Sequence, residues 1–190
     1  MRFSRREIQD LTLAWLALGL AFTFFFEGPG LLDAAPSVVV LAFLGSLLTV
    51  GVGFLLHELA HKVVAVRFGQ IAEFRADYGM LFLAVAGGLA GFIFAAPGAV
   101  HHRGHITERE HGLIALAGPV TNLALAALFV PIALVVPLAW RGVTVNLLLA
   151  AFNMLPFGPL DGNTVRKWSI GIYVAVFVPS VALALLFFFG

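Results

Sequence analysis

Long apolar runs are the feature of this 190-residue sequence that most restricts its fold. Hydrophobic residues make up 61% of the chain and charged residues only 11%, whereas soluble domains carry about a quarter charged residues. A helix that crosses a bilayer needs about 20 predominantly apolar residues. The runs that meet or approach this length are 11–26, 37–56, 113–138, 143–156 and 170–189. We therefore expect an all-α polytopic membrane protein that forms a single domain over residues 1–190.

A sixth apolar run, residues 79–100, contains Gly87, Gly88 and Gly91 near its middle. If this run does not cross the membrane and the N-terminus is cytoplasmic, ten of the eleven basic residues lie on the cytoplasmic side and only Arg141 lies outside. If the run crosses, four of those ten move outside and the bias nearly disappears. Because cytoplasmic loops are enriched in Lys and Arg, we predict five transmembrane helices and a re-entrant element with a short strand. Six transmembrane helices are the alternative.

The second apolar run ends in the sequence His57-Glu58-Leu59-Ala60-His61. Residues four apart lie on one face of a helix, so the two imidazoles can bind one Zn²⁺. Glu58 lies beside them and can activate water for hydrolysis. Ionisable groups at the end of an apolar span are costly and mark a functional site. The alternative is a polar helix end at the membrane interface.

A catalytic zinc site needs a third protein ligand and one open position. Asp161 follows the fourth apolar run and is the only acidic residue between Glu110 and the C-terminus. In the five-helix topology the second and fourth runs point in the same direction, which brings Asp161 to the membrane face of His57 and His61. With six crossings Asp161 would lie on the opposite face. We predict Asp161 as the third ligand, with a turn residue before Gly162 as the alternative.

Two further motifs accompany this set. Residues Asn153, Pro156, Leu160, Asp161 and Gly162 form an N-x-x-P-x-x-x-L-D-G pattern. Residues Gly118, Pro119 and Asn122 form a G-P-x-x-N pattern on the intervening run. With these three motifs in this order, the sequence resembles the site-2 protease family of intramembrane zinc metalloproteases, over roughly residues 50–165.

The resemblance implies a three-helix catalytic core within about residues 37–165 and one zinc ion held by His57, His61 and Asp161. It also implies cleavage of membrane-embedded segments of other proteins, that is, regulated intramembrane proteolysis. Glu58 would then be the catalytic acid/base.

An amide side chain is expected to stabilise the oxyanion of the peptide-hydrolysis intermediate, and both Asn122 and Asn153 are candidates. For Asn122 the alternative is an interhelical hydrogen bond that fixes packing. Asn153 could equally cap the bend at Pro156.

A substrate helix must unwind before its backbone can be cleaved, and an exposed strand edge can hold the extended segment. Residues 92–96 are the candidate for this edge, with a purely structural turn as the alternative. The histidines that follow lie in a polar loop, which favours a solvated interfacial segment over a second metal site. These histidines are His101, His102, His105 and His111.

Composition excludes other classes of function. The chain has no cysteine, which excludes thiolate ligands and nucleophiles, and its net charge of +1 leaves no basic face for nucleic acid. The expected partners are transmembrane protein substrates and the lipid bilayer. We expect an integral protein of a prokaryotic plasma membrane with its active site towards the cytoplasm. The alternatives are a catalytically silent scaffold or chaperone of the same fold, and a metal transporter.

Overall fold

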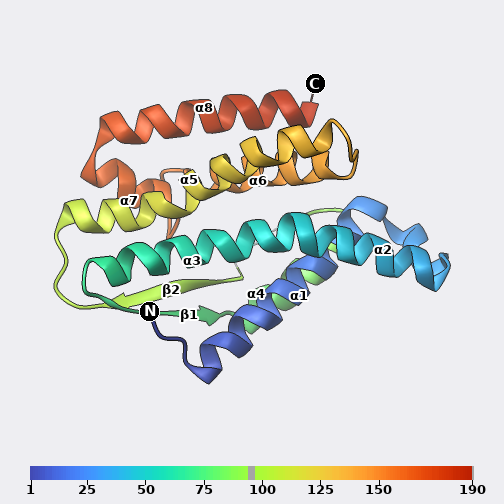
Figure 1. Ribbon diagram of the computed structural model, residues 1–190, viewed down its shortest axis with the longest axis horizontal. Coiled ribbons are helices and arrows are strands. Elements are labelled where there is room, and N and C mark those ends of the chain that lie inside the picture. Colours follow the sequence, from blue (N-terminus) through green and yellow to red (C-terminus); the bar gives the residue numbers. More distant parts are fainter. Residues whose placement is uncertain (94–96, 190) are drawn as a thin grey trace. The chain divides into compact units, whose positions relative to one another are not determined.

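The computed structural model describes residues 1–93 and 97–189, and Figure 1 shows its helices and its two-stranded sheet. The long helices and the strands follow in chain order: α1 (Arg5–Glu27), α2 (Pro36–Ser46), α3 (Val52–Arg67), β1 (Ile71–Ala76), α4 (Tyr78–Leu89), β2 (Gly98–Arg103), α5 (Glu108–Ala133), α6 (Ala139–Asn153), α7 (Asp161–Trp168) and α8 (Ile170–Phe189). Two short elements complete the helical part: the 3₁₀-helix η1 (Pro29–Asp33) and the π-helix η2 (Leu47–Gly51).

The chain divides into two compact units. The motif unit contains residues 56–72 and the described residues from 102 onward, and therefore holds the H-E-x-x-H sequence. The N-terminal unit contains residues 2–55 and 73–101. The two units are described separately.

Helices α5, α6, α7 and α8 make up most of the motif unit, where α6 packs on both α5 and α8. Small side chains allow close packing: a Cβ added to Gly142 of α6 would lie 2.7 Å from the Phe129 ring of α5. Helix α5 starts with a capping box, in which the Glu110 amide donates to Thr107 Oγ1 (3.2 Å) and the Thr107 amide donates to Glu110 Oε2 (2.8 Å). This cap fixes where the helix that faces the metal ligands begins.

In the N-terminal unit, two buried acids on α1 hold the segment around β1. Phe74 N donates to Glu7 Oε1 (3.0 Å), and Tyr78 Oη donates to Asp10 Oδ1 (2.5 Å). Glu7 and Asp10 are each 1% exposed. Buried carboxylates are costly unless they accept hydrogen bonds, so these contacts explain how α1 tolerates two acids before its apolar stretch.

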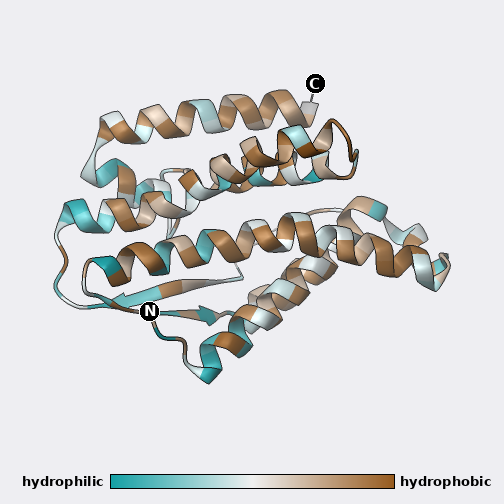
Figure 2. Ribbon diagram, in the orientation of Figure 1, coloured by the Kyte–Doolittle hydropathy of each residue, from teal (hydrophilic) through white to brown (hydrophobic). Residues whose placement is uncertain are grey.

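Four helical segments are long and apolar enough to cross a membrane within the described residues: α1, the continuous segment Pro36–Arg67, α5 and α8. Figure 2 shows apolar residues along these helices and polar residues on α7. The fourth predicted run forms α6, whose 15 residues span about 22 Å, less than the roughly 30 Å of a hydrocarbon core. The number of crossings therefore stays a prediction.

The sixth apolar run, residues 79–100, folds into more than one element. Helix α4 has 12 residues and is about 18 Å long, too short to span the bilayer by itself. The strand that follows α4 in the described residues is β2. Of the predicted edge 92–96, Phe92 and Ile93 have no regular secondary structure, and 94–96 lie outside the described residues. The partner of β2, strand β1, was not predicted.

Strands β1 and β2 form a two-stranded sheet and run in opposite directions (Figure 1). Gly98 starts β2 with φ +150°, and a Cβ there would lie 2.2 Å from Arg75 O. Only glycine allows this close approach of the two backbones.

Candidate metal centre

Helix α3 carries both histidines of the motif on one face, as their spacing predicts. The two Nε2 atoms lie 3.0 Å apart, and the imidazole rings meet edge to face with centroids 4.6 Å apart. Both side chains are buried, at 5% exposure for His57 and 8% for His61. The donor atoms of the two imidazoles therefore converge on one point inside the motif unit.

Asp161, the first residue of α7, adds a third donor at the same point. Its Oδ2 lies 3.4 Å from His57 Nε2 and 3.4 Å from His61 Nε2. Three ligands bound to one tetrahedral zinc at about 2.0–2.2 Å have donor atoms roughly 3.3–3.6 Å apart. Distances of 3.0, 3.4 and 3.4 Å therefore match a shared zinc ion. Within the described residues this is the one group of three such side chains with converging ligand atoms.

The backbone after α6 explains how Asp161 reaches this position. Gly158 has a φ of +60°, which places a left-handed turn between the two helices. A Cβ on Gly162 would lie 2.0 Å from Met154 O. Helix α7 thus begins directly against the end of α6, and Gly162 is required for that contact.

The other nitrogen of each histidine bonds to α5. His57 Nδ1 lies 2.6 Å from Asn122 Oδ1, and His61 Nδ1 lies 2.7 Å from the backbone oxygen of Ile114. Both partners are acceptors, so each Nδ1 carries a hydrogen, and Nε2 is the nitrogen that is left to bind a metal. The hydrogen-bond network thereby assigns the tautomer that a zinc ligand needs.

Gly118 lies between these two partners on the same face of α5, since residues 114, 118 and 122 are four apart. A Cβ at Gly118 would lie 2.4 Å from His61 Nε2 and 2.5 Å from His57 Nε2. The missing side chain leaves the space beside the two donor atoms.

The charge of Asp161 also fits a cation. Its Oδ2 is buried and has no hydrogen-bond partner in the described part of the chain. An ionised carboxylate oxygen without a donor, next to two imidazole lone pairs, suits Zn²⁺ in charge and in ligand type.

The remaining predicted residues lie at different distances from this cluster. Glu58 is 7% exposed and lies in the same turn of α3 as His57. Asn122 contacts His57, whereas Asn153 Nδ2 donates to Leu149 O within α6 (2.9 Å). Asn122 thus makes the interhelical hydrogen bond of the alternative interpretation, and the oxyanion roles of Asn122 and Asn153 both stay predictions.

Two polar groups beyond the predicted set complete the surroundings: the Ile114 carbonyl and Asn146, which accepts a hydrogen bond from Asn122 Nδ2 (2.8 Å). No sequence signal marks a backbone carbonyl. For Asn146 the sequence did contain a signal, because an amide side chain is unusual in the apolar run 143–156.

The histidine-rich loop contributes no side chain to the group of three converging ligand atoms found in the described residues. The His102 and His111 rings lie 5.4 Å apart, edge to face. The His105 carbonyl accepts a hydrogen bond from Gln70 Nε2 (2.9 Å). Neither contact assembles three ligand atoms.

Comparison with known proteins gives relatives along nearly the whole chain. The chain is 42% identical to MJ0611 of Methanocaldococcus jannaschii, over 99% of this chain and 97% of that protein. It is 36% identical to Rip3 of Mycobacterium tuberculosis, over 80% of this chain and 37% of that protein. It is 32% identical to YwhC of Bacillus subtilis, over 60% of this chain and 64% of that protein. All three carry the name "Putative zinc metalloprotease". No family model and no solved structure matches the chain.

Proposed function

Because the chain belongs to the same zinc metalloprotease family as these relatives, we propose that it is an intramembrane peptidase of the site-2 type. Its substrates would be peptide bonds in or near transmembrane segments of other membrane proteins. The observation that carries the proposal is the convergence of His57 Nε2, His61 Nε2 and Asp161 Oδ2 within 4.8 Å. Both histidines belong to the apolar segment Pro36–Arg67, which is long enough to cross a membrane.

In this proposal His57, His61 and Asp161 would hold one Zn²⁺. Zinc, when bound, supplies Lewis-acid activation of water and of the scissile carbonyl. Glu58 is the general base: its carboxylate accepts a proton from the attacking water and then delivers that proton to the leaving nitrogen. Burial of Glu58 supports this role, because a carboxylate shielded from bulk water exchanges its proton with the substrate and not with solvent.

The two amides take separate roles in the proposal. Asn122 orients His57, since its Oδ1 already accepts from that imidazole. Asn153 stabilises the oxyanion, because Nδ2 carries a second hydrogen besides the one donated to Leu149 O.

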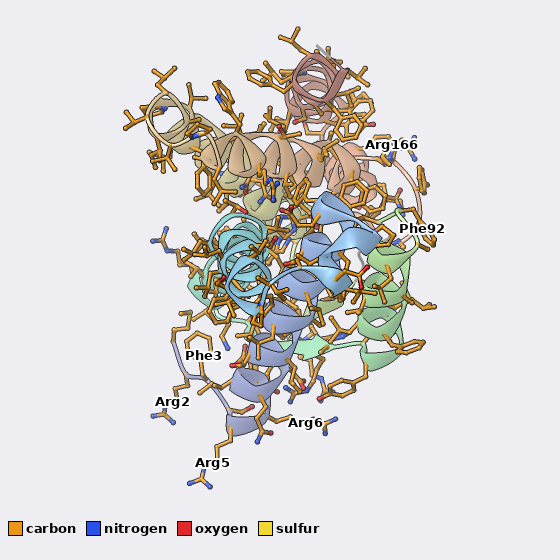
Figure 3. The ribbon with its side chains drawn as sticks, turned by 90° about the vertical axis from the view of Figure 1, so that its right-hand side faces the viewer. Arg2, Phe3, Arg5, Arg6, Phe92 and Arg166 are labelled. Atoms are coloured by element: carbon orange, nitrogen blue, oxygen red, sulfur yellow. The ribbon has the colours of Figure 1, made fainter. Side chains whose placement is uncertain are left out.

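We also propose that the N-terminus and the metal ligands lie towards the cytoplasm of a prokaryotic cell. Arg2, Arg5 and Arg6 project from the start of α1 (Figure 3), and basic residues at a helix end favour the cytoplasmic side. The chain has no cysteine, so a single His105→Cys substitution provides a specific label. The substituted residue should react with an impermeant thiol reagent only after the membrane is opened. Reaction in intact cells would contradict this orientation.

The central experiment incubates the purified chain in detergent with single-span membrane proteins and measures both cleavage and bound zinc. The wild type should contain about one zinc per chain and cleave a substrate. Glu58→Gln should keep the zinc and lose cleavage, whereas His61→Ala should lose both, because His61 is a ligand and Glu58 is not. Wild-type protein without stoichiometric zinc would refute the proposal.

The same measurements separate the other functions. A silent scaffold would bind zinc in the wild type without cleaving any substrate in the panel. A transporter would move zinc across liposome membranes, and Glu58→Gln would not stop it.

A further inference from the structure

A chain of hydrogen bonds extends from the ligand His57 through two helices. His57 Nδ1 donates to Asn122 Oδ1 (2.6 Å), Asn122 Nδ2 donates to Asn146 Oδ1 (2.8 Å), and Asn146 Nδ2 donates to the Gly142 carbonyl (2.8 Å). Asn122 on α5 and Asn146 on α6 are both 0% exposed. Two fully buried amides in line with a metal ligand are costly to desolvate, which indicates a specific role for the second one.

The backbone carbonyl at the end of this chain sets its direction. A carbonyl only accepts, so the amide nitrogen of Asn146 must face Gly142 and its oxygen must face Asn122. Because Asn146 Oδ1 is an acceptor, the Asn122 atom that faces it must be the donor Nδ2. Asn122 Oδ1 then faces His57. His57 must therefore donate from Nδ1, which makes Nε2 the nitrogen available to zinc.

Reversing either amide would place two donors or two acceptors against each other in a site without solvent. The two ends of the Asn122 amide are nearly equal in size, so hydrogen-bond partners and not shape set its orientation. Asn146 supplies the fixed reference, since its own nitrogen bonds to a carbonyl of the same helix, α6.

We propose that Asn146 is a positioning residue of the metal site: through Asn122 it holds His57 in the tautomer that presents Nε2 to zinc. This inference rests on the proposed function, since it treats His57 as a zinc ligand. Partners of metal-bound histidines typically change metal affinity by about 10- to 100-fold when they are lost. We expect a change of that size in zinc affinity when Asn146 is lost, although Asn146 contacts Asn122 and not His57, because Asn146 orients Asn122.

The test measures zinc affinity by competition with a chelating dye in detergent, for variants that remove or keep the acceptor. Asn146→Leu removes it at similar volume and should weaken zinc binding by about 10- to 100-fold. Asn146→Asp keeps an oxygen towards Asn122 and, when protonated, a donor towards Gly142, and should restore most of the affinity. If leucine prevents folding, Asn146→Ala replaces it, because alanine adds no bulk.

A matched control and a double substitution separate positioning from packing. Ser180 is also 0% exposed and donates to a carbonyl one turn back, Val176 O (2.7 Å), but it belongs to α8, which carries none of the three ligands. Ser180→Ala should leave zinc affinity unchanged. In an Asn122→Ala background, Asn146→Leu should have no further effect on zinc affinity, because Asn146 acts only through Asn122.

Three outcomes decide the inference. Unchanged zinc affinity in Asn146→Leu would overturn it. It would also be overturned if Asn146→Leu lowered zinc affinity by the same factor in the wild type and in the Asn122→Ala background. A Co²⁺-substituted protein whose visible absorption changes in Asn146→Leu and returns in Asn146→Asp would support it. If the wild type itself binds no zinc, the proposed function is refuted, and the positioning role is refuted with it. If the wild type binds zinc and Asn146→Leu has no effect, only the positioning role is refuted.

Discussion

Gly118 offers the sharpest test of the metal centre, because a single methyl group must enter the space beside both ligand nitrogens. In Gly118→Ala the new Cβ would lie 2.4 Å from His61 Nε2 and 2.5 Å from His57 Nε2. Ordinary contact between such atoms begins near 3.5 Å, so the clash requires a displacement of about 1 Å. Metal sites accept deviations of only about 0.2 Å in ligand distance.

The histidines cannot relieve this clash by moving away from α5. His61 Nδ1 is bonded to Ile114 O and His57 Nδ1 to Asn122 Oδ1, and both acceptors lie on α5 with Gly118 between them. Overpacking of this kind costs about 1–3 kcal/mol. Since each 1.4 kcal/mol is a factor of ten, zinc affinity should fall by roughly 10- to 100-fold.

The assay is a dye-competition zinc titration, with thermal denaturation in detergent to verify folding. Gly171→Ala is the matched control, because Gly171 is also helical and a Cβ there meets nothing within 4 Å. It should keep wild-type zinc affinity and gain up to about 1 kcal/mol of stability from helix propensity. Wild-type zinc affinity in Gly118→Ala would refute the geometry of the centre.

Two further predictions concern the elements that present the ligands. Gly162→Ala places a Cβ 2.0 Å from Met154 O, so it should separate α7 from α6 and abolish zinc binding; retention of stoichiometric zinc by elemental analysis would contradict this. Thr107→Ala removes the N-cap of α5 and should lower the free energy of unfolding by about 1 kcal/mol, whereas Thr107→Ser should be nearly neutral. Equal melting temperatures for the two Thr107 variants would argue against the cap.

Much of the centre follows from local rules that a sequence displays. The spacing of His57 and His61 places them on one helical face regardless of what packs against α3. Asp161 required an additional argument, the distribution of basic residues, which predicted the face on which the fourth apolar run ends. The structure brings the donor atoms of all three residues together.

The features that the sequence did not predict depend on pairing between distant segments. Strand β1 has only six residues, and its partner lies more than twenty residues later, so its short alternating pattern carries little weight. The same holds for Asn146: its residue type is unusual in an apolar helix, but its function depends on meeting Asn122 across α5 and α6. Pairing of this kind is set by tertiary packing, which leaves no periodic trace in either segment.

The partners of the two histidines differ in one respect that bears on how this centre can evolve. His61 bonds to a main-chain oxygen, which no side-chain replacement at Ile114 removes. His57 bonds to a side chain, and Asn122 can be exchanged by a single codon change. Substitutions can therefore change the hydrogen-bond partner of His57 but not that of His61. Natural variants with altered zinc affinity should carry their substitutions at Asn122 or at Asn146, its partner on α6.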